Sequence, residues 1–327
     1  MRDSNLKLGN LLASKYHKEY GVITYSGTLA IELALISANL PAGSKVLVSN
    51  TVCSSIVQTI IKLNLKPVVV CPQDGLILRA SDIEKVVQKI DISCIIVVHQ
   101  YGLVNPVLEI RQLCQDKIII EDIAQAYDIE INSKVTGQYS DYLVTSFGIT
   151  KPLSYGIGGS VISNNKQLLN YVDFADSESR NTKEILSAYA YPLCEQIDFT
   201  KLLTEGKAVV EHQRLIAKTI NQILPINNIS YFIDNIGDNS VWHRFPIWID
   251  DLKILKVVTK ILDDNEVGYQ FPHEVELQDL PLFKEKIIVV DNRIKKDYFI
   301  LIRTRTNTVD KVKKAFLEIR DVLTKSI

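Results

Sequence analysis

The 327-residue chain has almost no net charge and no long apolar run. Its 37 Lys and Arg residues against 38 Asp and Glu leave a net charge of -1, which gives no electrostatic case for nucleic acid or an anionic membrane as a partner. No stretch approaches the roughly 18 uninterrupted apolar residues that a membrane span needs. The first residues, 1–5, have no apolar core of the kind found in a signal peptide. We expect a protein without a membrane partner.

Cysteine is scarce and scattered. The five cysteines are Cys53, Cys71, Cys94, Cys114 and Cys194. None of them forms a C-x-x-C pair, which argues against a disulfide framework and against a zinc cluster. The expectation is therefore a reduced, cytoplasmic setting and no bound metal.

The remaining composition is that of an ordinary globular protein, 46% hydrophobic and 23% charged, large enough for one large and one small domain. Apolar strands alternate with helical patterns through the first half of the chain. The predicted strands are 22–24, 46–48, 67–70, 95–98, 117–121, 142–145 and 160–162. They are continuous apolar runs, which is typical of strands covered on both faces. The pattern predicts an α/β domain with a mostly parallel mixed sheet flanked by helices.

Two helix starts have a local signature. Ser81 followed by Glu84 predicts a capping box that opens a helix to about residue 90. Asn105 before Pro106 predicts an N-cap with a proline in the first helical position, and a helix running to about Cys114.

Beyond residue 166 the pattern changes. A long helix is predicted for 198–224, followed by a turn-rich break around 235–239. After it come a strand at 242–249, a helix at 252–262, a strand at 298–302 and a helix at 309–323. This is the pattern of a small α+β domain. We expect a large domain over 1–235 and a small C-terminal domain over 236–327.

One lysine and one carboxylate follow two of the predicted strands. Lys151 lies just past the strand 142–145, and Asp122 ends the strand 117–121. A pyridoxal phosphate (PLP) enzyme needs a lysine that bonds covalently to the cofactor aldehyde and a carboxylate that keeps a proton on the pyridine nitrogen. Pro152 biases Lys151 towards an extended conformation, so the lysine is expected to project from a turn. The pair predicts a PLP site.

Further polar residues gather at the same edge, because in open α/β sheets ligands bind beyond the carboxyl ends of the strands. Ser146 ends one strand. Gly27 and Thr28 form a turn that opens a helix, and a helix start offers free N–H groups and a positive dipole end to a phosphate. His99 also ends a strand, and for it we favour a hydrogen-bonded structural role over direct chemistry.

The chain resembles the DegT/StrS sugar aminotransferases of PLP fold type I. The resemblance rests on four ordered motifs: Ser26-Gly27-Thr28, Val98-His99-Gln100-Tyr101-Gly102, Ile120-Glu121-Asp122-Ile123-Ala124-Gln125-Ala126, and Ser146-Phe147-Gly148-Ile149-Thr150-Lys151-Pro152. It covers about residues 15–165 well and the remainder more loosely. It implies fold type I with a small C-terminal domain.

The resemblance also implies roles for single residues. Lys151 is the implied catalytic residue, which holds the cofactor and moves the substrate proton. Asp122 pairs with the ring nitrogen, and Gln125 lies beside the ring. Gly27, Thr28 and Ser146 hold the phosphate. Cys53 stands where the family usually places an aromatic ring that stacks on the cofactor.

The implied reaction converts a nucleotide-linked keto-sugar to an amino-sugar with an amino acid such as glutamate as donor, for polysaccharide, lipopolysaccharide or aminosugar biosynthesis. The resemblance further implies a homodimer. Two alternatives stay open: another PLP reaction on this fold, such as a sugar dehydratase or an aldolase-like enzyme, and a non-catalytic paralogue that binds a sugar nucleotide. Arg180-Asn181 is the nearest candidate for the family's partner-subunit motif. His273 lies near a substrate-side histidine of such enzymes.

Overall fold

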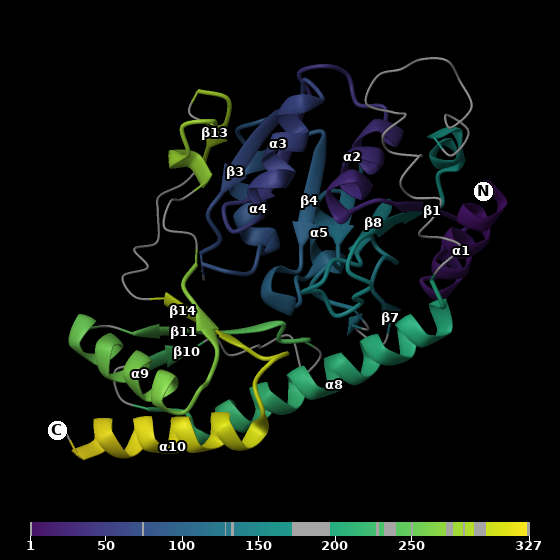
Figure 1. The fold of residues 1–327 in the computed structure, drawn as a ribbon. Helices are drawn as coiled ribbons and strands as arrows, with labels where there is room; N and C mark the ends of the chain where they lie inside the picture. Colours follow the sequence, from purple (N-terminus) through teal and green to yellow (C-terminus); the bar gives the residue numbers. More distant parts are fainter. Residues whose placement is uncertain are drawn as a thin grey trace.

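The fold is an α/β arrangement of an eight-stranded sheet, a four-stranded sheet, a short hairpin and flanking helices, seen in a computed structural model (Figure 1). The structure describes residues 2–73, 75–127, 129–131, 134–171, 197–226, 229–231, 240–249, 251–272, 277–283, 285–290 and 299–325. Within these residues, every helix is too short or too polar to cross a membrane.

The larger sheet has eight strands in the order β1-β9-β8-β5-β4-β2-β3-β13. The strands are β1 (Tyr20–Thr24), β2 (Lys45–Ser49), β3 (Lys66–Val70), β4 (Cys94–Val98), β5 (Ile118–Asp122), β8 (Tyr142–Ser146), β9 (Gly159–Ser163) and β13 (Ile288–Val289). The six from β8 to β13 run parallel, whereas β9 is antiparallel to both β8 and β1. The predicted mostly parallel mixed sheet is confirmed.

Both faces of this sheet are covered because successive strand residues point to opposite sides. In β5, Ile119 packs in one apolar core and Ile120 in the other. The first core includes residues of α1 (Arg2–Lys15), α4 (Ala80–Val87), α5 (Val107–Leu113) and the start of α8 (Phe199–Ile223). The second includes residues of α2 (Gly27–Ser37) and α3 (Ser54–Lys62). Continuous apolar strands are the consequence of this double cover.

Short elements complete this part of the chain. They are η1 (Gln100–Gly102), the hairpin β6 (Glu130–Ile131) and β7 (Lys134–Val135), η2 (Lys166–Tyr171) and η4 (Leu277–Asp279).

Both predicted helix starts are wrong in detail. Helix α4 begins at Ala80, and the Asp82 carboxylate accepts the Arg79 N–H at 3.1 Å, so Ser81 is not the N-cap. Helix α5 has Pro106 as its N-cap. The side chain of Asn105 instead accepts the Leu78 N–H at 2.8 Å and donates to the carbonyl of Val98 at 2.9 Å. The side-chain amide of Asn105 was predicted to cap the helix, but it bonds to residues that are distant in the chain instead.

The smaller sheet has the order β10-β11-β14-β12 and is antiparallel. Its elements, with their helices, are β10 (Ile229–Tyr231), β11 (Arg244–Ile249), α9 (Leu252–Asp264), β12 (Tyr269–Gln270), β14 (Phe299–Arg303) and α10 (Val309–Lys325). The end of α8 packs in the core of this sheet, so the long helix runs beneath both parts of the molecule (Figure 1). The expected boundary at residues 235 and 236 lies outside the described residues.

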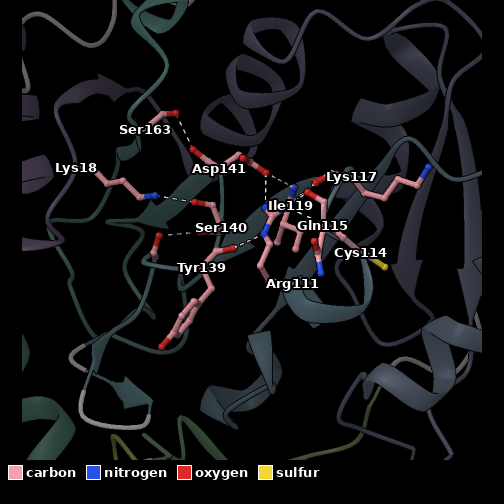
Figure 2. Close-up of polar contacts among 11 residues, drawn as sticks. Lys18, Arg111, Cys114, Gln115, Lys117, Ile119, Tyr139, Ser140, Asp141 and Ser163 are labelled. Atoms are coloured by element: carbon pink, nitrogen blue, oxygen red, sulfur yellow. Dashed lines mark hydrogen bonds and ion pairs between the residues drawn. The ribbon is translucent and has the colours of Figure 1, made fainter. Parts of the chain in front are cut away.

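A polar cluster ties α5 to the amino ends of β5 and β8 (Figure 2). Arg111 donates to the Asp141 carboxylate at 2.6 Å and to the carbonyls of Tyr139 and Lys117, both at 2.9 Å. The same carboxylate accepts the Ile119 N–H at 2.7 Å. These bonds hold the amino ends of the two strands in place. Asp122 and Ser146 lie at the other ends, the carboxyl ends, of the same strands.

Candidate active site

Lys151 lies in the turn that joins β8 to β9, as the following proline predicted. Its backbone N–H donates to the carbonyl of Gly148 at 2.9 Å. Its carbonyl accepts from a guanidinium nitrogen of Arg305 at 2.6 Å, and the same nitrogen reaches the carbonyl of Ile149 at 2.9 Å. The turn is therefore held from within and by a residue that follows β14.

Asp122 ends β5 next to that turn, since β5 and β8 are parallel neighbours and Asp122 is in register with Val144. The carboxyl group is buried, and it accepts the Ala124 N–H at 2.8 Å. Burial raises the pKa of Asp122, while the Ala124 hydrogen bond, Lys151 and His99 oppose that rise. The structure thus brings the predicted carboxylate into the electrostatic range of the predicted lysine.

The pKa of the Lys151 amine is lowered, which favours the nucleophilic free base. Burial lowers the pKa of Lys151, Asp122 and Cys53 partly oppose this, and Arg244 adds to it. A lysine with a lowered pKa has a larger fraction of free base, and the free base is the nucleophile. The chemistry expected of this lysine needs that form.

Gly27 and Ser146 meet at the start of α2. A Cβ atom added to Gly27 would lie 2.9 Å from the Cβ of Ser146 and 3.3 Å from its hydroxyl oxygen. That hydroxyl accepts the Gly148 N–H at 3.3 Å. Ser26 caps the helix by accepting the Leu29 N–H at 3.2 Å, and Thr28 follows Gly27 in the first turn. The structure brings Gly27, Thr28 and Ser146 together at a helix N-terminus, which favours an anion.

Gln125 follows β5, and its side chain is tied to the turn after β4. Its carbonyl oxygen accepts the Tyr101 N–H at 3.2 Å, and its amide nitrogen donates to Gln100 at 3.0 Å. Tyr101 has a positive φ of 59°. These bonds hold the side-chain amide of Gln125 in one orientation. Gln125 itself follows shortly after Asp122 in the chain.

His99 has the structural role that was favoured for it. The ring is fully buried, with Nε2 3.0 Å from the Glu121 carboxylate and Nδ1 accepting the Asn105 N–H at 3.0 Å. Since Nδ1 accepts, Nε2 carries the proton and donates to Glu121. The pair supports the strand end that carries Asp122.

Four residues on the small-sheet side of the Lys151 turn were not predicted as site residues: His243, Arg244, Arg303 and Arg305. Burial, followed by Arg244 and Lys151, holds the pKa of His243 well below its usual range. A readable signal was present, because two arginines alternate at the end of β14.

Of the other candidate residues, Cys53 is described, and it lies near Lys151. Cys53 is exposed at the N-cap of α3, within electrostatic range of Lys151. His273, Arg180 and Asn181 lie outside the described residues.

Comparisons with known proteins give a family and several relatives. The model of the DegT/DnrJ/EryC1/StrS aminotransferase family matches residues 3–296. A GDP-perosamine synthase of Escherichia coli O157:H7 is 30% identical over 166 residues, covering 50% of this chain and 45% of that enzyme. A 3-oxo-glucose-6-phosphate:glutamate aminotransferase of Bacillus subtilis is 25% identical over 295 residues, covering 84% of this chain and 65% of that enzyme.

The fold has a counterpart among solved structures. NtdA of Bacillus subtilis with bound cofactor PMP superimposes with a TM-score of 0.75 at 19% identity, covering 96% of this chain and 76% of that one. This likeness shows the fold. The match spans less than half of the perosamine synthase and less than two thirds of the second curated relative.

Proposed function

The chain belongs to the DegT/DnrJ/EryC1/StrS aminotransferase family, and we propose that it is a PLP-dependent aminotransferase that converts a keto-sugar to an amino-sugar. The observation that carries the proposal is the placement of Lys151 and Asp122 at the carboxyl edge of the sheet, where each influences the pKa of the other. The two side chains lie on a turn and a strand that neighbouring strands hold in place. A lysine and a buried carboxylate in that arrangement are what PLP chemistry requires.

The residues present fit PLP in three respects. Asp122 is a buried carboxylate whose raised pKa would be relieved by the cationic N–H of a pyridinium. Lys151 is a half-buried lysine with a lowered pKa. The contact between Gly27 and Ser146 leaves no room for a Cβ, so backbone and hydroxyl can approach a phosphate closely. Gln125 would lie beside the ring.

When bound, PLP supplies an electron sink for the carbon that loses a proton. Lys151 would take that proton on its Nζ atom and return it, and a lowered pKa favours the free base that takes the proton up. Asp122, when ionised, would lie beside the ring nitrogen and keep it protonated. Gly27, Thr28 and Ser146 fix the phosphate end and so set the distance from the ring to Lys151.

The substrate is proposed from the relatives. GDP-perosamine synthase is named for a nucleotide-linked sugar, and the second relative for a keto-sugar and glutamate. We propose a nucleotide-linked keto-sugar and an amino acid such as glutamate, with a product used for polysaccharide, lipopolysaccharide or aminosugar biosynthesis. The chain would act in the cytoplasm.

We further propose a homodimer of two-domain subunits. Ile149, Tyr155 and Ile157 expose 75%, 39% and 47% of their surface in the β8–β9 connection that carries Lys151. Exposed apolar residues that cluster in this way are typical of a subunit interface. The large domain would end near residue 235, and the antiparallel sheet that starts at β10 would form the core of the small one.

Glutamate-dependent conversion of a keto-sugar tests the proposal. The purified chain with added PLP should produce 2-oxoglutarate and an amino-sugar in equal amounts, and Lys151→Ala should abolish both. Loss of water from the sugar without consumption of glutamate would instead favour the dehydratase alternative. A chain that binds the sugar nucleotide but converts none of it would favour the non-catalytic alternative.

A further inference from the structure

A pocket of about 500 Å³ opens beside the Lys151 turn, and the proposed roles of the cofactor-binding residues leave it unexplained. Its polar lining is Thr150, Arg244, Gln270, Arg303, Arg305 and Thr306. Three of these six side chains are guanidinium groups. The pocket therefore combines a high positive charge with amide and hydroxyl groups that donate hydrogen bonds.

The strand register brings the arginines together. Arg244 begins β11 and Arg303 ends β14, and the two residues are directly opposite each other in the antiparallel pair. Arg305 follows two residues later. Like charges directly opposite in a sheet destabilise it, because their side chains extend from the same face. An arrangement that costs stability in the free protein indicates a ligand of opposite charge.

Among the residues that the structure describes, no carboxylate neutralises these charges. Across the described part of the chain, no carboxylate forms an ion pair with Arg244, Arg303 or Arg305. Arg244 donates to the Gln270 carbonyl oxygen at 3.2 Å and to the His243 carbonyl at 2.8 Å. Burial lowers the pKa of Arg244, and Arg303 and Arg305 lower it further. The cluster therefore carries a surplus of positive charge.

His243 lies against the cluster. A guanidinium nitrogen of Arg244 lies 3.2 Å from Nε2 of His243, and the amide nitrogen of Gln213 lies 3.2 Å from its Nδ1. The pKa of this buried histidine is held well below its usual range, so the ring is neutral and adds no charge to the cluster. Arg305 is fixed in turn by its bonds to the carbonyls of Ile149 and Lys151. Arg305 thus links the pocket to the Lys151 turn, and Ile149 and Thr150 of that turn also line the pocket.

We propose that Arg244, Arg303 and Arg305 bind the phosphate or diphosphate group of the keto-sugar and thereby place the sugar ketone beside Lys151. This inference rests on the proposed function and names the part of the substrate that the protein recognises. A phosphate ester or diphosphate carries at least two negative charges and several acceptor oxygens, which match three guanidinium groups. Glutamate has two carboxylates but also an ammonium group, so its net charge of -1 matches three guanidinium groups less well.

Titration with inorganic diphosphate, followed by calorimetry on the PLP-saturated chain, tests this assignment. Saturation with PLP fills the cradle at Gly27 and Ser146, so that the anion reports on the arginine pocket. We expect one bound diphosphate per chain. Arg303→Gln should weaken binding roughly tenfold or more, since a charge-assisted contact is lost. Arg320→Gln is the matched control, because it removes an equal charge from the exposed face of α10, and it should bind as the wild type does.

Each contrary result would overturn the assignment. Equal affinity of the wild type, Arg303→Gln and Arg320→Gln would show that the pocket does not hold the anion. Diphosphate that PLP displaces would belong to the phosphate cradle. Weaker binding of glutamate but unchanged binding of diphosphate in Arg303→Gln would assign the pocket to the amino donor. Because the titration needs no turnover, its failure is separate from failure of the aminotransferase proposal.

Discussion

The contact between Gly27 and Ser146 allows the phosphate cradle to be tested by adding one methyl group. In Gly27→Ala the new Cβ would lie 2.9 Å from the Cβ of Ser146 and 3.3 Å from its hydroxyl oxygen. Real Cβ atoms do not approach so closely, so the start of α2 and the end of β8 must move apart. Overpacking of this kind costs about 1–3 kcal/mol in the free energy of unfolding.

The same displacement moves the Ser146 hydroxyl away from the bound phosphate. Loss of one hydrogen bond to a charged group costs about 1.5–3 kcal/mol. The dissociation constant for PLP should then rise roughly ten- to hundredfold. Absorbance titration with PLP measures the affinity, and urea unfolding of the PLP-free chain measures the stability separately.

Two further variants make the test specific. Gly268→Ala is the matched control, because its added Cβ would meet nothing closer than 3.4 Å, and PLP affinity should stay unchanged. In a chain that already carries Ser146→Gly, adding Gly27→Ala should cost almost no stability, because the clashing side chain is gone. PLP affinity should stay weak in that double variant. Wild-type affinity and stability in Gly27→Ala would refute the reasoning.

Three other perturbations have defined outcomes. The pKa of Lys151 is lower in the folded chain than in the unfolded chain. Between these two pKa values the unfolded chain binds more protons, so the free energy of unfolding of the PLP-free chain should rise with pH in that range. Lys151→Met should flatten that rise in urea unfolding and stabilise the chain at neutral pH; an unchanged slope would contradict the burial argument. Cys53→Phe should tighten PLP binding by about 0.5–1.5 kcal/mol through ring stacking, whereas Cys53→Ala should not, and equal affinities would argue against a place beside the ring. Arg111→Gln should lower the free energy of unfolding by about 1–2 kcal/mol, a value reduced for solvent screening because the Arg111 and Asp141 side chains are 23% and 39% exposed. PLP affinity should stay unchanged in this variant. A loss of PLP affinity would contradict the position of Arg111 at the edge of the sheet opposite to the cofactor site.

The strands of the large sheet were predictable because each is an apolar run that ends at a polar residue. Strand β5 is an example, with Ile119 and Ile120 facing the two cores and Asp122 at its end. Burial on both faces requires such runs, so their positions are visible in a single sequence. The two-residue strand β13 was not predictable, since Ile288 and Val289 extend the sheet only by pairing with β3, far away in the chain.

Local signals failed where a distant partner competed. Asn105 has the right type and position for an N-cap, but its amide bridges Leu78 and Val98. The arginine pocket illustrates the same limit. The alternation of Arg303 and Arg305 is visible in the sequence, whereas the position of Arg244 opposite Arg303 depends on the pairing of β11 with β14. Sequence motifs were enough to predict Lys151 and Asp122 at the carboxyl edge of the large sheet. The position of the arginines beside Lys151 could be found only from the pairing of the strands in the small sheet.

Reduction with borohydride tests the central claim most directly. The full chain would be mixed with PLP, reduced, digested and analysed by mass spectrometry. We predict one pyridoxyl group, attached to the peptide that contains Lys151, and its absence from Lys151→Ala treated in the same way. A chain that retains no pyridoxyl group, or that carries it on another lysine while Lys151 is unmodified, would contradict the assignment of this turn as a PLP site.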